Sequence, residues 1–560
     1  MIGTLSPRQT RVVVTALAAV FAMAFAAQRA WVCDDAFISF RYAENFAHGD
    51  GLVYNVGERV EGYSNFSWTL LCALAIRCGL DPVGFAQVLG VLCYGALVVV
   101  TMRVGERLAP ATAGKVAFLP LAAIGVALHQ HLQDFATCGL ETLLFVLLAT
   151  LLVGALAVAE RPAQFAVASG IAVLAALTRP DGALLGGIAG AWALWCSWRR
   201  RSAAPAVAFA LPGVLLFVPF LIWRLVYYGD LLPNTFYAKS AGDPYPGQGW
   251  FYLQLFFNGY WVLWPALLLM PVLLALARRL GKAVLLPLFV LPYLAFVVWV
   301  GGDFMFARFC LPVVPLLYLG LEVLVRRWCR PNAQWVALVA VAVATFCWHE
   351  RDDLLHMGET VRGVADERAQ YPPTRVQGLR HVGRRLGQVL AGTPARVAFS
   401  GTQAMLVYEA KFAYALEAVT GLTDRFLAHQ VLAKRGQPGH EKGIFSSPEA
   451  TNYALQTQRV HLLLVDHPPM TSVYPWLEVE LFGMAATLVR WDREVMAPLL
   501  RTPGVRIVDL EQHLDDYLAH LDEKAPAQVR ADFGAFELVY FRWNQDAPRR
   551  DRFVQWLAKH

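Results

Sequence analysis

Hydrophobic residues are gathered into long runs with short polar breaks over residues 1–348, whereas apolar and polar positions are mixed over residues 349–560. A helix needs about 20 mostly apolar residues to cross a bilayer. Combined with the positive-inside bias, the runs predict about eleven transmembrane helices in residues 1–348. The later region has strand-like runs, among them 396–400 and 536–541, between amphipathic stretches, which predicts a small α/β domain.

The ends of the apolar runs set the expected topology. The first run, 12–27, follows Arg8 and Arg11, and we expect a retained first helix with a cytoplasmic N-terminus. The clusters Arg199-Arg200-Arg201 and Arg326-Arg327 then fall inside. The run 66–80 is short for a span of about 20 residues. We therefore expect an interfacial or re-entrant helix there, within a large first external loop of about 33–82, and an external α/β domain.

Composition agrees with a membrane protein and excludes several function classes. The chain is 57% hydrophobic and only 16% charged, against about 25% charged residues in soluble proteins. A net charge of +6 argues for membrane orientation and against nucleic-acid binding. No phosphate loop, dinucleotide fingerprint or His-Glu-x-x-His zinc motif is present. A soluble nucleotide donor is also hard to supply on the external face. An enzyme that acts there therefore needs a lipid-borne donor.

Asp34 and Asp35 stand directly beyond the first hydrophobic run. Charge at the edge of a bilayer is costly, so two adjacent carboxylates there indicate a functional site. One carboxylate can accept a hydroxyl proton while its neighbour positions a substrate or tunes the first. The alternative is a simple polar stop at the end of a helix. Cys33 and Cys138 are expected in the same compartment, and the sequence leaves open whether they are bonded.

Three cations, Arg179, Lys239 and Arg308, stand at external helix ends. The positive-inside bias makes external cations unusual, which favours recognition of an anion, with phosphate as the obvious candidate. The alternative is snorkelling of long basic side chains to lipid headgroups. Three acidic residues occupy the same helix ends: Glu141, Asp181 and Asp303. For these we favour pairing with the cations over catalysis.

A metal or cofactor requirement is not expected. No ligand cluster stands out beyond Asp34-Asp35, and the three cations can supply the charge that a divalent ion would bring. An acidic pair can also bind a hard cation through oxygen, which keeps the alternative open.

The pair Asp34-Asp35, followed by Arg41-Tyr42-Ala43-Glu44, resembles the first external loop of GT-C superfamily glycosyltransferases, which are polytopic enzymes that use polyprenyl-phosphate sugars. The longer stretch 34–68 is similar to the terminal arabinofuranosyltransferases of actinobacterial cell walls and their proteobacterial relatives. The likeness continues in further motifs: Gly51-Leu52-Val53-Tyr54-Asn55, Arg179-Pro180-Asp181-Gly182, Pro233-Asn234-Thr235-Phe236-Tyr237, Gly421-Leu422-Thr423-Asp424-Arg425 and Pro438-Gly439-His440-Glu441. The chain departs from the family at Leu416-Glu417-Ala418, where an Ile-Asp-hydrophobic run is expected.

The resemblance implies a polytopic GT-C fold in the bacterial inner membrane, with the active site and the C-terminal domain periplasmic. It implies that Asp34 is the base on the acceptor hydroxyl and that Asp35 supports it. The implied donor is decaprenyl- or undecaprenyl-phospho-arabinofuranose, and the acceptor is a cell-envelope glycan or glycoconjugate. Supporting or substrate-binding roles are expected for a wider set: Arg41, Tyr42, Glu61, Tyr63, Asn65, Glu141, Asp181, Asn234, Tyr237 and Asp303.

Two alternatives to an inverting glycosyltransferase are a transporter or flippase for a lipid-linked sugar and a non-catalytic lipid-binding scaffold. A transporter is expected to show charges deep within spans or repeated halves with broken helices. Here the charges gather at one face, and the chain shows no internal repeat. For residues 349–560 we expect contact with the acceptor and no chemistry, because loops on a rigid scaffold commonly carry recognition.

Overall fold

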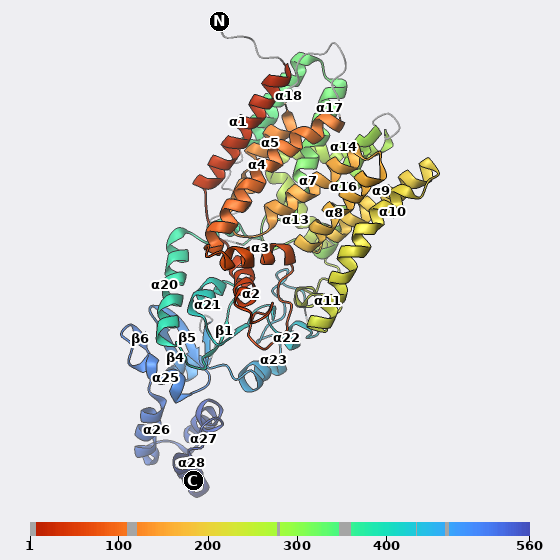
Figure 1. Cartoon of the computed structure of the whole chain (residues 1–560). Helices are drawn as coiled ribbons and strands as arrows, with labels where there is room; N and C mark the ends of the chain where they lie inside the picture. The colour runs from red at the N-terminus through yellow and green to blue at the C-terminus, as the bar shows by residue number, and fades with distance from the viewer. Residues whose placement is uncertain (1–6, 109–119, 277–280, 347–359, 433, 465–469) are drawn as a thin grey trace. The chain divides into compact units, whose positions relative to one another are not determined.

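The computed structural model describes residues 7–108, 120–276, 281–346, 360–432, 434–464 and 470–560. The chain divides into two units (Figure 1). The helical unit comprises Met1–Gly49, Tyr63–Pro372 and Gly436–Gly439, and the α/β unit comprises Asp50–Gly62, Pro373–Arg435 and His440–His560. The predicted border between 348 and 349 falls within 347–359, which lie outside the described residues.

Helices make up nearly all of the regular structure in the helical unit. In chain order they are α1 (Pro7–Gln28), α2 (Ala36–His48), α3 (Phe66–Arg77), α4 (Pro82–Leu108), α5 (Leu121–Leu128), α6 (Gln130–Thr137), α7 (Thr142–Val158), α8 (Pro162–Thr178), α9 (Gly182–Arg200), α10 (Ala204–Pro212), η1 (Gly213–Phe217), α11 (Val218–Tyr228), α12 (Asn234–Ala238), α13 (Pro246–Gly259), η2 (Trp261–Leu263), α14 (Trp264–Ala275), η3 (Gly281–Val284), α16 (Leu285–Val300), η4 (Leu311–Val313), α17 (Val314–Trp328), α18 (Pro331–Phe346) and α19 (Glu367–Gln370).

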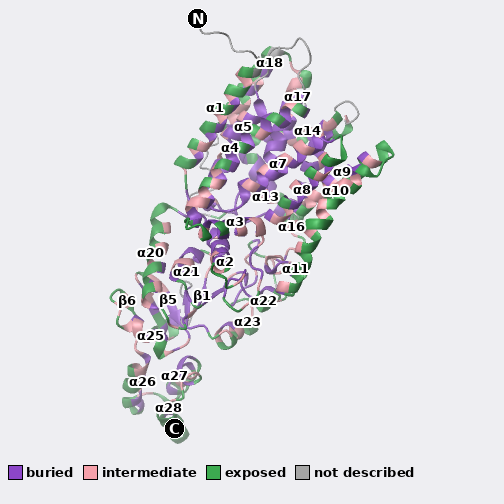
Figure 2. Ribbon diagram, in the orientation of Figure 1, coloured by how far each residue is buried: buried purple, intermediate pink, exposed green. Residues whose placement is uncertain are grey.

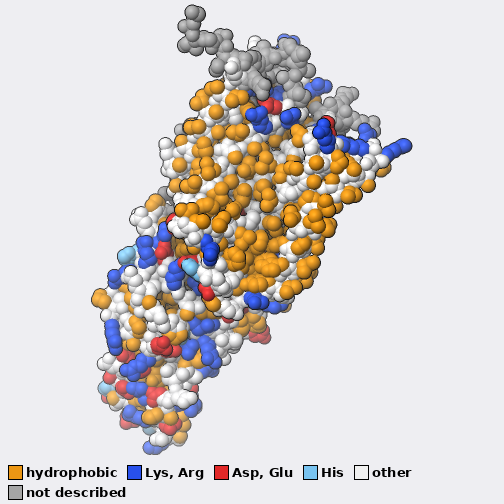
Figure 3. Space-filling model, viewed as in Figure 1, with side chains coloured by type: hydrophobic (Ala, Val, Ile, Leu, Met, Phe, Trp, Pro, Cys, Tyr) orange, Lys and Arg blue, Asp and Glu red, His pale blue; other side chains and the backbone are white. Residues whose placement is uncertain are grey.

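Several of these helices are long and apolar enough to cross a membrane. Among the described residues there are four such helices, and α13 with η2 and α14 forms a further candidate bent by 102°. Four shorter apolar helices accompany them: Phe66–Arg77, Thr142–Val158, Pro162–Thr178 and Asn332–Phe346. Figure 3 shows hydrophobic side chains spread over the visible face of the helical unit. The number of about eleven spans stays a prediction.

Burial separates lipid-facing helices from interior ones. The run Ala204–Tyr228 is apolar, yet none of its most hydrophobic stretch is buried, and α10 and α11 are largely exposed in Figure 2. Large exposed apolar surfaces are typical of membrane or protein contacts. Most side chains of α7, by contrast, are buried. Helix α3 has 12 residues, about 18 Å of helix, which is too short for a hydrocarbon core of about 30 Å and fits a helix that does not span.

The α/β unit is built on one six-stranded sheet in the order β2-β1-β3-β5-β4-β6. Strands β2, β1 and β3 run parallel, and β5, β4 and β6 join by antiparallel pairs. The strands are β1 (Arg396–Phe399), β2 (Tyr414–Glu417), β3 (Leu462–Leu464), β4 (Glu478–Leu481), β5 (Met484–Leu488) and β6 (Val505–Arg506). The helices are α20 (Pro373–Val389), α21 (Ala404–Ala410), α22 (Arg425–Ala428), α23 (Pro448–Asn452), η7 (Tyr453–Thr457), α24 (Met470–Val473), η8 (Pro475–Leu477), α25 (Arg493–Leu500), α26 (Leu510–Ala519), η9 (Leu521–Glu523), α27 (Pro526–Phe536), η10 (Glu537–Phe541) and α28 (Ala547–Lys559).

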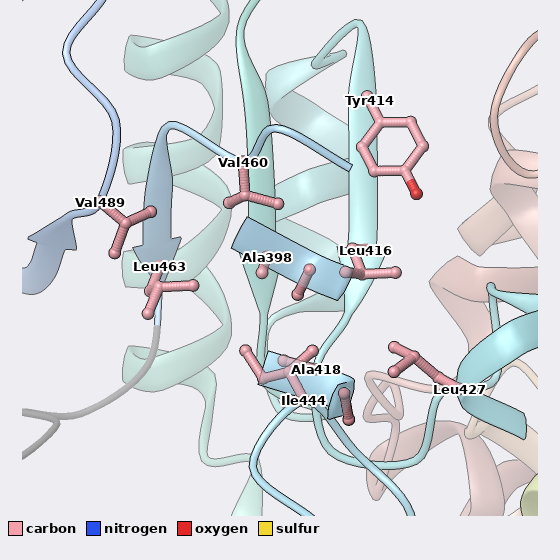
Figure 4. Packing of buried hydrophobic residues seen from close by; sticks show 11 residues of the cluster. Ala398, Tyr414, Leu416, Ala418, Leu427, Ile444, Val460, Leu463 and Val489 are labelled. Carbon is pink, nitrogen blue, oxygen red and sulfur yellow. The ribbon is translucent and has the colours of Figure 1, made fainter. Parts of the chain in front are cut away.

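Buried side chains from the parallel strands meet those of the loops and helices that follow them. Figure 4 shows Ala398, Leu416 and Leu463 packed with Ile444 and Leu427. The run 536–541, predicted as a strand, is instead the π-helical continuation of α27. Phe536 is buried, as are Val539, Tyr540 and Phe541, which follow it by three, four and five positions. Three consecutive buried residues do not show the alternation of a half-buried strand.

Part of the predicted first external loop, Asp50–Gly62, belongs to the α/β unit. Asn55 Nδ2 donates to the Ala415 carbonyl and Asn55 Oδ1 accepts from the Ala415 N–H, both at 3.0 Å. Ala415 is in β2, the edge strand, whose outward backbone groups need partners. Tyr54 also stacks on Phe399 with ring centroids 6.3 Å apart. The Gly51–Asn55 motif is thus explained by its hold on the sheet edge.

Candidate functional site

The acidic pair lies in the short loop that joins α1 to α2. Asp34 is fully buried, and Asp35 is half-buried at the start of α2. The Cys33 N–H donates to the Cys138 carbonyl at 2.8 Å, which fixes this loop against the loop before α7. Cys33 and Cys138 are both free thiols, so the disulfide that the sequence left open is absent from the structure. The loop that carries Asp34 and Asp35 is therefore held in place by backbone hydrogen bonds and by burial.

Glu141 is the centre of a buried polar cluster in the helical unit. The carboxylate, 3% exposed, accepts from Asn65 Nδ2 at 2.8 Å, Arg308 Nη2 at 3.2 Å and Arg179 Nη1 at 3.4 Å. Asn65 in turn bonds Ser39 on α2. Residues far apart in the sequence therefore converge on one carboxylate, and this cluster is connected to the helix that follows Asp34-Asp35.

Arg179 is held on several sides. Its Nε donates to Asp181 Oδ1 at 2.9 Å, and Tyr293 donates its hydroxyl to Asp181 Oδ2 at 2.5 Å. The guanidinium also lies near the rings of Phe145 and Phe309, with its central carbon 5.3 and 5.1 Å from their centroids. Such a guanidinium has little freedom to turn toward a ligand. Its position suits support of the site better than capture of a mobile substrate.

Arg308 joins the Glu141 cluster to the acidic pair. Besides Glu141, its guanidinium faces Asp303 at 3.7 Å and the sulfur of Met305 at 3.5 Å. Asp35 interacts with it electrostatically. The predicted pairing of the acidic residues with the arginines is confirmed, because Glu141, Asp181 and Asp303 each face one of the two guanidiniums.

Lys239 differs from the two arginines. It follows α12, is half-buried, and makes no ion pair with any residue in the described part of the chain. Its Nζ lies 5.9 Å from the centroid of the Phe304 ring. A Cβ added to Gly439 would meet the Lys239 side chain at 3.4 Å, so the Pro438-Gly439 motif of the helical unit contacts this lysine. Of the three predicted cations, Lys239 is the one without a carboxylate partner among the described residues.

The other predicted residues lie on several elements. Tyr63 and Tyr228 share a hydrogen bond of 3.1 Å between their hydroxyls, and the Tyr42 ring lies 4.8 Å from that of Tyr63. Three more positions belong to the helical unit, and one to the α/β unit: Arg41 is buried on α2, Asn234 is buried and Tyr237 half-buried on α12, and Glu61 is buried within the Asp50–Gly62 segment of the α/β unit.

Sequence reasoning missed Glu367, at the start of α19. This residue is 9% exposed, and burial, followed by the charges of Asp35, Asp303 and Asp34 and opposed by Arg308, raises the pKa of its carboxyl to about 8. The sequence predicts an α/β domain that begins near 349, whereas the α/β unit resumes at Pro373. The available signal is Pro372-Pro373, because proline favours the first turn of a helix and the α/β unit resumes at Pro373 with α20. Residues 360–372 therefore belong to the helical unit.

No group of three or more His, Cys, Asp or Glu side chains in the described part of the chain is arranged to hold a metal ion. The expectation that activity needs no metal stays a prediction.

No protein-family model matches the chain. Two curated proteins are similar to it, and both are terminal β-(1→2)-arabinofuranosyltransferases. The protein from Mycobacterium tuberculosis is 31% identical over 357 residues, which cover 54% of this chain and 55% of the relative. The protein from Corynebacterium glutamicum is 30% identical over 401 residues, which cover 62% of this chain and 56% of the relative. The chain thus spans about half the length of the curated relatives that it matches.

Two crystal structures of ArnT from Cupriavidus metallidurans share the fold. The structure bound to undecaprenyl phosphate matches with a TM-score of 0.51 over 74% of this chain and 87% of ArnT. The apo structure matches with a TM-score of 0.54 over 86% of this chain and 98% of ArnT. Sequence identity is 14% in both, so these matches identify the fold alone. The predicted GT-C fold and the resemblance to terminal arabinofuranosyltransferases are confirmed, and the chain is a multi-pass membrane protein.

Proposed function

We propose that this chain is a membrane glycosyltransferase that moves an arabinofuranosyl or related pentose unit from a polyprenyl-phosphate donor to a cell-envelope glycan or glycoconjugate, with inversion. The observation that carries the proposal is the junction of the Glu141 cluster with Asp34-Asp35. Arg308 faces Glu141 at 3.2 Å and also interacts with Asp35. A fixed cation beside a carboxylate pair, one member of which is fully buried, suits displacement of a phosphate by a hydroxyl.

The donor would be held by its phosphate. Lys239 is the cation best able to meet it, because no carboxylate among the described residues already pairs with its ammonium group. Arg308 would face the phosphate from the Glu141 cluster, and Arg179 would support Arg308 through their shared carboxylate. Negative charge grows on the phosphate oxygen as the glycosidic bond breaks, and these fixed cations would stabilise it.

The acceptor hydroxyl would be activated by Asp34. Asp34 would take the proton as the hydroxyl oxygen attacks the anomeric carbon from the face opposite the phosphate. The electron pair of the broken C–O bond stays with the polyprenyl phosphate. A single displacement with one base and no carboxylate nucleophile gives inversion at that carbon.

The compartment and the acceptor follow from topology. The positive-inside bias favours a site on the periplasmic side of a bacterial inner membrane. There the acceptor is a glycan or glycoconjugate, and the α/β unit is the soluble part available to select it. We propose that residues 1–348 carry the donor chemistry and that residues 349–560 contact the acceptor. Residues 360–372 and 436–439 are exceptions to this division, because they belong to the helical unit.

The test is transfer by the purified full-length protein in lipid nanodiscs. Radiolabelled decaprenyl-phospho-arabinofuranose serves as donor and an arabinan oligosaccharide as acceptor. We expect a new glycosidic product whose anomeric configuration is opposite to that of the donor. It should be lost in Asp34→Asn and retained in Asp551→Asn, whose aspartate is exposed in α28. Donor that crosses the bilayer unchanged would favour a flippase. Asp34→Asn with wild-type transfer would rule out the assigned mechanism.

A further inference from the structure

A segment beyond the last apolar helix returns to the loops of the reaction centre. Within residues 360–371, Ala365 donates its N–H to Phe304 at 2.8 Å and accepts from the Phe306 N–H at 2.9 Å. Arg368 Nε bonds the Arg29 carbonyl at 3.3 Å and faces Asp134 at 3.5 Å. These contacts all lie within the helical unit. The segment is therefore fixed to the loops that precede α2 and η4.

A third attachment fixes the end of the segment. Tyr371 stacks on Trp31 with ring centroids 6.5 Å apart. Between the attachments, Asp366 caps α19 by accepting from the Arg368 N–H at 3.1 Å. Glu367 begins that short helix, and its place is thus determined by backbone and ring contacts on both sides. The contacts of the 360–371 segment therefore keep the Glu367 side chain buried.

Glu367 is surrounded by more acid than base. Among the described residues, the titratable or charged groups that interact with it come from the loop before α2, the loop before η4 and its own segment: Cys33, Asp34, Asp35, Asp303, Arg308 and Tyr371. The one cation in that set, Arg308, already faces Glu141 at 3.2 Å and Asp303 at 3.7 Å. A buried carboxylate without its own cation favours its neutral form.

We propose that Glu367 is a positioning residue that holds a proton beside the Asp34-Asp35 pair and keeps the centre open to the anionic donor by remaining uncharged. Its O–H group would donate toward the pair and leave Asp34 ionised as the base. Its pKa of about 8 agrees with this state at neutral pH.

The inference rests on the proposed function for its chemical consequence. The donor phosphodiester brings one negative charge into the centre. During transfer, the acceptor proton goes to Asp34, the new C–O bond forms, and the phosphate keeps the electron pair of the broken bond. Glu367 neither gains nor loses a proton in this step. When Glu367 ionises at higher pH, its added negative charge opposes donor binding, so the KM for the donor rises while kcat changes little.

The experiment compares pH profiles of wild type, Glu367→Gln, Glu367→Ala and the control Glu523→Gln, whose glutamate is exposed. For wild type and control, we expect kcat/KM for the donor to fall above pH about 8 and to level off once Glu367 is ionised, because the added charge weakens donor binding. Glu367→Gln and Glu367→Ala should lack this alkaline fall, because neither can ionise. An unchanged alkaline fall in whichever of these two variants folds would overturn the inference.

A binding measurement separates this inference from the proposed function. Binding of undecaprenyl phosphate to the full-length proteins in nanodiscs is measured over the same pH range, without any transfer. Binding that weakens above pH about 8 in wild type, but not in Glu367→Gln, supports the inference even if no sugar is transferred. Equal pH dependence in the two proteins overturns it, whereas absent transfer with this binding pattern counts against the proposed function alone.

Discussion

Both units bury a glutamate, but they satisfy it in opposite ways. Glu141 in the helical unit accepts from Asn65, Arg179 and Arg308, residues up to 167 positions away. Glu417 in the α/β unit is 1% exposed and accepts from the backbone of Val419 and Thr420 at 3.0 and 2.7 Å. A carboxylate bound by its own loop shapes that loop. A carboxylate bound by distant cations assembles a site, so the contrast favours the helical unit as the place of chemistry.

The same contrast explains the departure at Leu416-Glu417-Ala418. Glu417 ends β2 and organises the turn that leads into the Gly421–Arg425 motif, where Asp424 caps α22 through the Leu427 N–H at 2.9 Å. Tyr453 and Gln458 also bond Asp424. These contacts account for both carboxylates by loop structure and fit an α/β unit that carries no chemistry.

The largest effect is expected from Asp34→Asn. Loss of a general base costs about 10²–10⁴-fold in rate, so kcat for transfer should fall within that range while the KM for the donor changes little. Single-turnover transfer measures the chemical step directly. Asp35→Asn should lower the rate less, and equal loss in the two variants would contradict the assignment of Asp34 as the base.

Glu141→Gln and Glu417→Gln make the same change in the two units and test the comparison directly. Glu141→Gln removes the charge between two buried guanidiniums and should destabilise the helical unit by about 3–5 kcal/mol. Glu417→Gln keeps an oxygen for only one of the two backbone N–H groups, because Val419 donates to Oε1 and Thr420 to Oε2. One buried donor is left unsatisfied, which should cost about 1–3 kcal/mol. Hydrogen exchange followed by mass spectrometry reads the two units separately.

The outcome that would break the comparison is a larger loss of protection around β2 in Glu417→Gln than around α7 in Glu141→Gln. Glu417 would then contribute more to stability than Glu141 does, and ion pairs between distant residues would no longer indicate the functional site.

Lys239→Met tests which cation meets the donor. A hydrogen bond to a charged group is worth about 1.5–3 kcal/mol, so the KM for the donor should rise about 10–100-fold with the fold intact. Lys559→Met, at the exposed end of α28, is the matched control. A wild-type KM in Lys239→Met would indicate that Arg179 and Arg308, and not Lys239, bind the donor phosphate.

The smallest effect is expected from Asn55→Ala in the α/β unit. The two bonds to Ala415 would be lost, at a cost of about 1–2 kcal/mol in the local stability of β2. Faster exchange of the β2 amides with an unchanged kcat is the expected result, and Asn452→Ala, at an exposed position, is the control. A large fall in kcat would show that the Asp50–Gly62 segment does more than hold the sheet edge.

The sequence by itself determined the helical half, the α/β half, the acidic pair and the cations at helix ends. These follow from local patterns, because burial in lipid requires apolar runs and charge beside a run is visible without knowing the fold. It also predicted the pairing of Glu141, Asp181 and Asp303 with arginines. The predicted strand at 536–541 is wrong, because periodicity alone does not separate a helix from a strand in a short apolar run.

Only the tertiary structure decided how these parts combine. It showed that Lys239 differs from Arg179 and Arg308, because ion pairing depends on which distant carboxylates pack beside each cation. It also divided the first external loop between two units and brought Glu367 to the acidic pair. The physical reason is that hydrophobic periodicity is encoded locally, whereas the charge state of a buried carboxyl is set by neighbours that the folded chain brings together.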